Sequence, residues 1–224
     1  MRSRAVALAV AVGASSCGLI SSDIDDVKFS LPENKFEVSV SDFRLAGFGS
    51  KVPEVPCEQV DCATEGTRFC SDTSRCSASC GGDLCQVSAR ISVFEKVDLR
   101  PTLSKLDGKV KVSIDSVRFD VTDNSLSIDT PPLDVFIAPF TVTDAGNEGA
   151  KRVGTIAPVP AKTVLASKLE FTEGGKATME EFMANYETEF NVFLVGQVTL
   201  KGGQDVPTGG IVGTIKAVAV ASAF

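Results

Sequence analysis

The chain has 224 residues, 43% of them hydrophobic and 23% charged, which is typical of globular proteins and excludes disorder along the full length. It has no histidine, which excludes a Ser-His-Asp triad, a Cys-His pair and an HExxH zinc site. Its net charge of −7 opposes contact with nucleic acid, so we expect no nucleic-acid partner.

The first residues have the layout of a signal peptide. Arg2 and Arg4 precede an uninterrupted apolar run at residues 5–14, and small residues then lead to Cys17. The run is about ten residues long, whereas roughly 20 are needed to cross a bilayer. We therefore predict that residues 1–16 are a signal peptide.

The segment Ala14-Ser15-Ser16-Cys17 resembles the lipobox of bacterial lipoproteins. The resemblance covers only these residues and implies that Cys17 carries acyl chains such as palmitate, on its sulfur and on the amino group exposed by cleavage. Members of that family usually have Leu three residues before the cysteine, where this chain has Ala14, so cleavage by an ordinary signal peptidase is the alternative. Gly18 follows, and not the Asp that signals inner-membrane retention. The resemblance thus implies a lipid anchor in the outer membrane, facing the periplasm or the surface.

After this start we expect a short polar tether at residues 17–25 and one β domain at residues 26–224. Apolar residues alternate on both sides of a turn at residues 31–34, which predicts two half-buried strands. The alternating residues are Val27, Phe29 and Leu31 before the turn, and Phe36, Val38 and Val40 after it.

Six cysteines lie close together in a segment that has few large apolar residues. They are Cys57, Cys62, Cys70, Cys76, Cys80 and Cys85. With Cys17 set aside the number is even, which in an exported chain predicts three disulfides within residues 57–85, in any of fifteen pairings. Metal binding is the alternative, although the paired C-x2-C ligands of a zinc site are absent. We predict a stapled insertion that the β domain can fold without, either an exposed recognition knob or a loop without a partner.

Strand patterns resume directly after Cys85 and continue over residues 87–93, 110–121, 126–128, 133–137 and 164–171. Within the second of these segments the alternation changes phase at Asp115-Ser116, which predicts a β-bulge.

A single helix is predicted over residues 179–188. Thr178 and Glu181 have the spacing of a capping box, and apolar residues recur at helical spacing behind them. Its apolar face comprises Met179, Phe182, Met183 and Tyr186, and we expect it to cover an end or edge of the sheet.

The last two strands are predicted to form an antiparallel hairpin, with residues 190–200 paired to residues 211–224. Both faces of the final strand are apolar, so we expect it to be central and Val220→Asp to abolish folding. About eight strands and one short helix predict a mainly β, antiparallel β-sandwich, and an immunoglobulin-like arrangement is one form that we consider.

No catalytic constellation stands out in the sequence. It has no G-x-S-x-G motif, and its glycine pairs lack the ending of a phosphate-binding loop. The acidic clusters at residues 23–26 and 144–148 do not match a calcium-binding loop and are interpreted as solvated charge. We therefore predict a binding or structural protein of the cell envelope that is not an enzyme, has no cofactor, and contacts an envelope protein partner. A carrier that holds an apolar ligand or lipid between its sheets is the alternative.

Overall fold

The computed structural model describes residues 27–31, 33–47, 49–103 and 110–223, so the predicted signal peptide, Cys17 and the tether lie outside the described residues. The described chain is mainly β, as predicted, with ten strands that pair antiparallel. The strands are β1 (Val27–Ser30), β2 (Asn34–Ser39), β3 (Cys76–Gly81), β4 (Leu84–Val97), β5 (Val110–Asn124), β6 (Leu133–Pro139), β7 (Lys151–Ile156), β8 (Ala166–Phe171), β9 (Phe190–Lys201) and β10 (Gly210–Ala223). The helices are the 3-10 helix η1 (Val40–Phe43), the single turns α1 (Gly66–Phe69) and α2 (Arg100–Leu103), and the longer α3 (Gly175–Ala184).

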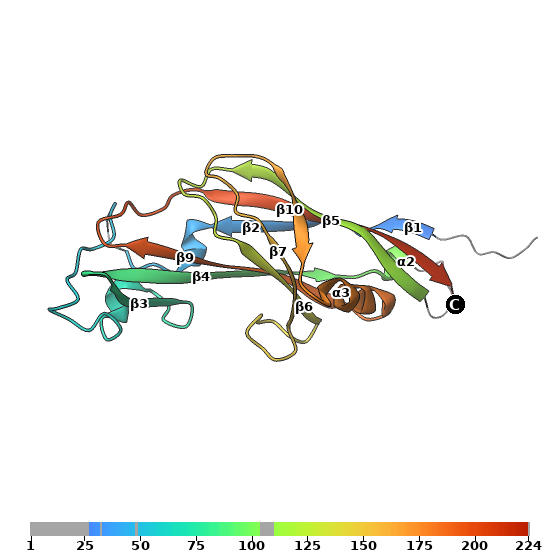
Figure 1. The fold of residues 1–224 in the computed structure, drawn as a ribbon, viewed down its shortest axis with the longest axis horizontal. Coiled ribbons are helices and arrows are strands. Elements are labelled where there is room, and N and C mark those ends of the chain that lie inside the picture. The colour runs from blue at the N-terminus through green and yellow to red at the C-terminus, as the bar shows by residue number, and fades with distance from the viewer. Residues whose placement is uncertain (1–26, 32, 48, 104–109, 224) are drawn as a thin grey trace, which may run out of the picture.

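One continuous path of strands folds back on itself and makes two layers (Figure 1). Neighbours follow the order β1-β10-β5-β8-β7-β6-β9-β4-β3, and β2 lies on the same edge of β10 as β1. The first half of β8 pairs with β5 and its second half with β7, so this strand joins the layers. The result is the sandwich-like β fold that the sequence predicts, with more strands than the seven to nine of an immunoglobulin domain. On the side opposite β8, no described strand closes the gap between the edges of β2 and β4.

The main core lies between the two layers. Phe119 and Ile215 enter it from one layer, and Val135 and Val192 from the other, all of them buried. Each layer of a sandwich buries one face, and for this reason alternation with a period of two marks its strands in the sequence.

β9 and β10 are both central strands, but they do not form the predicted hairpin. β9 pairs with β4 and β6, whereas β10 pairs with β5 on one edge and with β1 and β2 on the other. The loop at residues 202–209 carries the chain from one layer to the other. Alternation shows that a strand is central, but it does not show which strands lie beside it.

The buried face of β10 also differs from the prediction. Ala217, Ala219 and Ala221 are at most 1% exposed, whereas Val218 and Val220 are only partly buried on the outer face. The prediction that Val220→Asp buries a carboxylate is therefore wrong. An aspartate would instead be buried at position 219, where Ala219 faces the core.

The predicted β-bulge is present in β5. Ser116 pairs with Val218 and Ile114 pairs with Ala219, so Asp115 has no opposite residue in β10. The extra residue lets both Ile114 and Val117 face the core. The backbone N–H of Ile114 donates to the Glu180 carboxylate at 2.8 Å, which ties the bulge to α3.

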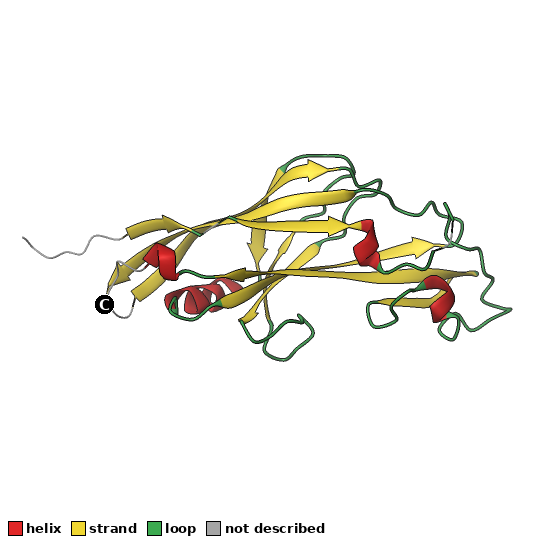
Figure 2. Ribbon diagram, turned by 180° about the vertical axis from the view of Figure 1, so that it is seen from behind, coloured by secondary structure: helices red, strands yellow, loops and turns green. Residues whose placement is uncertain are grey.

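Helix α3 begins at Gly175 and not at the predicted residue 179, because no capping box forms. Its N-cap is Gly174, with φ 74°, and Thr178 lies inside the helix. Glycine adopts this left-handed conformation without the strain that other residues suffer. The helix packs against β5 and β7 through Met179 and Met183, which confirms that its apolar face covers the sheet; Figure 2 shows it from behind.

The sequence pattern did not predict the strands β3 and β7, and one strand that it did predict is absent from the described residues. β3 has the sequence CSASCG, without large apolar residues, and β7 has KRVGTI, in which no clear alternation survives. Residues 126–128 form part of a loop in which Leu126 is nevertheless buried. Short strands with small or charged residues give too weak a pattern to be recognised.

Candidate functional site

The six clustered cysteines form three disulfides, as predicted. The pairs are Cys57–Cys80, Cys62–Cys85 and Cys70–Cys76. Cys80 and Cys85 are opposite one another in the β3–β4 hairpin, yet each bonds to a cysteine of the preceding loop. Two disulfides therefore staple the loop at residues 57–62 onto that hairpin.

Three of the cysteines lie close enough together to resemble a metal site. The sulfur atoms of Cys57, Cys62 and Cys85 lie within 4.8 Å of one another. All three belong to disulfides, however, and a zinc site needs thiolates.

The cysteine segment shares a core with the sandwich, so it is less separate than its composition predicts. Phe69 and Cys85 are fully buried there, beside Val198 and Leu200 of β9. Flanking residues also belong to this second core, among them Phe43, Val52, Val55 and Val87. Disulfides and a small apolar cluster together replace the large core that the segment lacks.

The segment lies at one pole of an elongated molecule. Figure 1 shows β3 and the cysteine loops at one end of the long axis, and β1 with the end of β10 at the other. We call residues 57–85 the cysteine pole. β4 alone, with 14 residues, covers roughly 45 Å of the distance between the ends at about 3.3 Å per residue.

Of the two acidic clusters considered as calcium sites, the structure describes only the one at residues 144–148. The cluster at residues 23–26 lies outside the described residues. In the other, Asp144 accepts a hydrogen bond from the Gly146 N–H and Asn147 from the Gly149 N–H, at 2.6 and 3.0 Å. These side chains cap turns of their own loop.

An ion cluster at the end of β4 was not recognised in the sequence. The Arg100 guanidinium donates to Asp98 at 2.8 Å and to Glu189 at 2.7 Å. The hydrogen bond from the Arg100 side chain to Asp98 lowers the pKa of Asp98 from its usual 3.8 to about 2. A carboxyl group that stays ionised suits a structural link between β4 and β9 and not a proton-transfer group.

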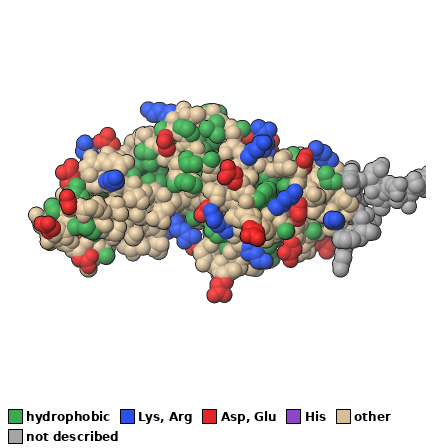
Figure 3. Space-filling view, viewed as in Figure 1, with side chains coloured by type: hydrophobic (Ala, Val, Ile, Leu, Met, Phe, Trp, Pro, Cys, Tyr) green, Lys and Arg blue, Asp and Glu red, His purple; other side chains and the backbone are tan. Residues whose placement is uncertain are grey.

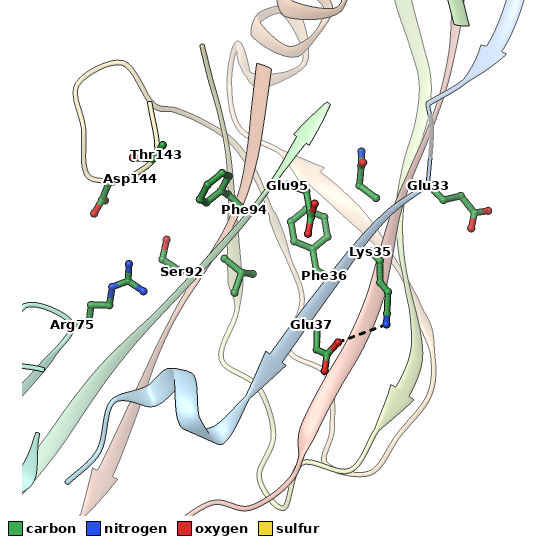
Figure 4. A pocket seen from close by; sticks show the side chains of 12 residues that line it. Glu33, Lys35, Phe36, Glu37, Arg75, Ser92, Phe94, Glu95, Thr143 and Asp144 are labelled. Atoms are coloured by element: carbon green, nitrogen blue, oxygen red, sulfur yellow. Dashed lines mark ion pairs between the residues drawn. The ribbon is translucent and has the colours of Figure 1, made fainter. Parts of the chain in front are cut away.

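A groove with a volume of about 630 Å³ lies between β2 and β4. Figure 4 shows the two strands diverging, with Phe36 and Glu95 between them and Phe94 turned to the loop of Thr143 and Asp144. Other residues complete the lining, among them Glu33, Lys35, Glu37, Arg75 and Ser92. The sequence predicts both strands but gives no signal that their edges stay open.

Charges of both signs surround this groove, and Figure 3 shows the same mixture over the whole face. Lys35 lies 3.6 Å from Glu37, and Lys216 lies 3.0 Å from Glu33, which raises the pKa of Lys216 through a hydrogen bond. Glu95 has neither an ion pair nor a hydrogen bond to any described side chain. Glu95 is thus a carboxylate without a direct ion pair in a groove that Lys35 and Arg75 also line.

The space between the layers is small by comparison. Two pockets lined mainly by core side chains, one near Phe43 and one near Met179, have volumes of about 20 and 10 Å³. Pockets for small organic ligands typically measure about 300–1,000 Å³. A lipid would have to part the layers to enter here.

No protein-family model matches this chain, and no curated protein matches it. Among the described residues, no helix is both long enough and apolar enough to cross a bilayer.

Proposed function

We propose that this protein is a lipid-anchored binding or structural module of the bacterial cell envelope, without catalytic activity. The observation that carries the proposal is the separation of its poles (Figure 1). The chain enters the fold at β1, ten residues after Cys17, and the cysteine pole lies at the far end. An acylated Cys17 would therefore present the cysteine pole away from the membrane.

The disulfides support the export that such an anchor requires. Three disulfides form and persist in an oxidising compartment such as the periplasm, and are rare in the cytosol. They also hold the loops of the cysteine pole in one shape, which reduces the conformational entropy lost when a partner binds.

A binding module is favoured over a lipid carrier by the volumes of the spaces. The described pockets between the layers hold about 20 and 10 Å³, whereas the open groove at the surface holds about 630 Å³ and is lined by charged residues. Polar open grooves suit contact with another protein better than storage of an acyl chain.

The anchor is tested by feeding cells labelled palmitate and separating membranes from soluble protein. The parent chain should carry the label and sediment with membranes, because two or more acyl chains give durable anchoring. Cys17→Ser should lose the label and be released. Labelled Cys17→Ser protein, or unlabelled parent protein, would contradict the proposal.

The binding role is tested by a photoreactive residue placed at exposed Glu58 of the cysteine pole, in intact cells. We expect a discrete crosslinked species, since a module that binds at this pole holds its partner within reach. The matched control carries the same photoreactive residue at exposed Lys28, next to the anchor. The same products from both positions would contradict a distal binding surface.

A further inference from the structure

We propose that the open edge of β4 at residues 92–96 receives an extended segment of a partner protein, which adds a strand in line with β3 and presents basic side chains to Glu95. This inference deepens the proposed function, since it rests on the protein being a binding module. It adds a second contact beyond the cysteine pole, at the β4 edge, and gives its binding mode and the chemistry of the partner.

Several backbone groups along one edge of β4 have no strand partner among the described residues. β3 pairs with β4 only from Leu84 to Ala89, and the Arg90 N–H donates to the Arg75 carbonyl at 2.7 Å just beyond. In an antiparallel ladder, alternate residues turn their N–H and C=O groups to the same edge. Ser92, Phe94 and Lys96 therefore point theirs to the side of β3, where no described strand lies.

The edge of β2, on the other side of the groove, is less suitable. The Val40 N–H donates to Gly209, so Lys35, Glu37 and Ser39 turn their backbone groups outward. Of these, the Ser39 N–H is already taken by the Asp42 carboxylate at 2.8 Å. β4 thus offers the longer run of open donors and acceptors.

The shape of the groove fits one added strand. The lining comes from both sides of the β4 edge, with Phe36 and Glu37 of β2 on one side and Arg75 and Asp144 on the other (Figure 4). Unpaired sheet edges are templates for a further strand, and many peptide-binding domains use them in this way. Main-chain hydrogen bonds then provide affinity, and the flanking side chains provide selectivity.

The flanking side chains define the two rows of the added strand. Val93 and Glu95 face the inner side, and the Glu95 carboxylate has no described partner, with Glu37 lining the same groove. A lysine or arginine opposite Glu95 would compensate this charge. Phe94 faces the outer side, 42% exposed, with its ring 5.3 Å from that of Phe193, and favours an apolar side chain in the outer row.

A second copy of the chain fits this edge less well than a basic partner. Two β4 edges paired antiparallel around Phe94 would bring the Glu95 carboxylates of both copies into one groove, and each copy carries a net charge of −7. Repulsion between the two nearby carboxylates would oppose this pairing. Self-association is therefore the competing outcome of the test.

The test uses the full chain as cells process it, in detergent micelles, with fluorescent peptides as probes. The first probe is Thr-Lys-Val-Lys-Val-Lys-Thr, and the second has glutamate in place of each lysine. The third is the lysine peptide with N-methyl groups on alternate amides, which removes donors without changing charge. We expect the lysine peptide to bind at least about tenfold more tightly than either control, because it alone keeps both the hydrogen bonds and the charge match.

Hydrogen exchange then places the peptide on the protein. Bound lysine peptide should slow the exchange of the Ser92, Phe94 and Lys96 amides and leave the exposed Lys35 and Glu37 amides of β2 unchanged. Protection of β2 alone, equal binding of the glutamate peptide, or no binding at millimolar peptide would overturn the proposal. Protection of the β4 amides that grows with protein concentration and needs no peptide would overturn it in favour of self-association.

Two variants test the edge from the protein side. Ser92→Pro removes one outward N–H and leaves the ladder to β9 intact. It should therefore weaken binding of the lysine peptide about tenfold, whereas Ser92→Thr should leave the affinity unchanged. Glu95→Gln should weaken binding of the lysine peptide severalfold, and Glu173→Gln, the same charge change at an exposed residue outside both the groove and the cysteine pole, should have no effect. If Ser92→Pro fails to fold, the N-methylated peptide tests the same hydrogen bonds on the unaltered chain.

The outcomes separate this inference from the proposed function. Failure of every peptide with normal crosslinking at Glu58 would reject the β4 site and leave the binding module intact. Peptide binding by a chain that is neither labelled with palmitate nor crosslinked would support the β4 site and reject the anchored module.

Discussion

The sandwich core and the cysteine pole are stabilised in different ways. The main core buries large side chains from both layers and from α3, such as Phe119, Ile137 and Met179. The second core has few large residues and includes the four buried cysteines of two disulfides, Cys62–Cys85 and Cys70–Cys76. The first is stabilised mainly by burial of apolar surface, and the second by restricting the unfolded chain as well. A region poor in apolar residues can therefore share a core with its neighbours and still depend on covalent links.

The largest effect is expected in the main core. Ala219→Asp places a carboxylate at a site that is 0% exposed and belongs to the apolar main core, so we expect a loss of more than about 4 kcal/mol and no stable fold. Val220→Asp, on the outer face of the same strand, should cost less than about 1 kcal/mol. Urea unfolding of both variants measures the difference, and equal losses would contradict the assignment of the faces.

The next effect concerns the cysteine pole. Replacing Cys62 and Cys85 together by alanine removes a buried disulfide that spans 23 residues and should lower the free energy of unfolding by about 2–4 kcal/mol. Replacing Cys70 and Cys76 by alanine removes a disulfide that spans only 6 residues, and should lower the free energy of unfolding by a smaller amount.

Reduction should loosen residues 57–85 and leave the main core folded. Because Val198 and Leu200 belong to the second core, exchange should also rise at that end of β9. Hydrogen exchange with and without reductant measures this. Global unfolding would show that the two cores are one cooperative unit, and an unchanged β9 would show that the cysteine pole is independent.

A smaller effect is expected where α3 meets the bulge of β5. Glu180→Ala leaves the partly buried N–H of Ile114 without its acceptor, which should cost about 1–2 kcal/mol. Glu181→Ala, the same change at an exposed neighbour, should stay within about 0.5 kcal/mol. Thermal unfolding of both variants distinguishes them, and equal values would show that the hydrogen bond to the bulge contributes nothing.

The smallest effect is electrostatic. The pKa of Asp98 is lowered to about 2, so its ion cluster stabilises the fold above the usual pKa of 3.8 and is lost as the pH falls through about 2. Arg100→Gln should move the pKa of Asp98 back up towards 3.8, because it removes the hydrogen bonds that favour the carboxylate. Carbon NMR titration of the side chain measures this, and an unchanged pKa would assign the shift to another group.

Several features could be recognised from the sequence because their causes are local. Alternation marked β4, β5, β6, β9 and β10 as strands, since a strand at the core buries every second side chain. The phase change at Asp115 predicted the bulge, and an even number of cysteines predicted three disulfides. Helix α3 was recognised from its apolar face, but its start was wrong because Gly174, and not Thr178, caps it.

Only the tertiary structure decided what meets across long sequence separations. β9 and β10 lie in different layers although eight residues join them, because each finds its partners among distant strands. The disulfide pairing depends on how the loop at residues 57–62 crosses the β3–β4 hairpin. The open edge at Ser92, Phe94 and Lys96 exists because β3 begins only at Cys76, opposite Ala89, and because β2 joins the other layer. Side-chain alternation along one segment records burial, whereas edges and pairings depend on which strands come together in the folded chain.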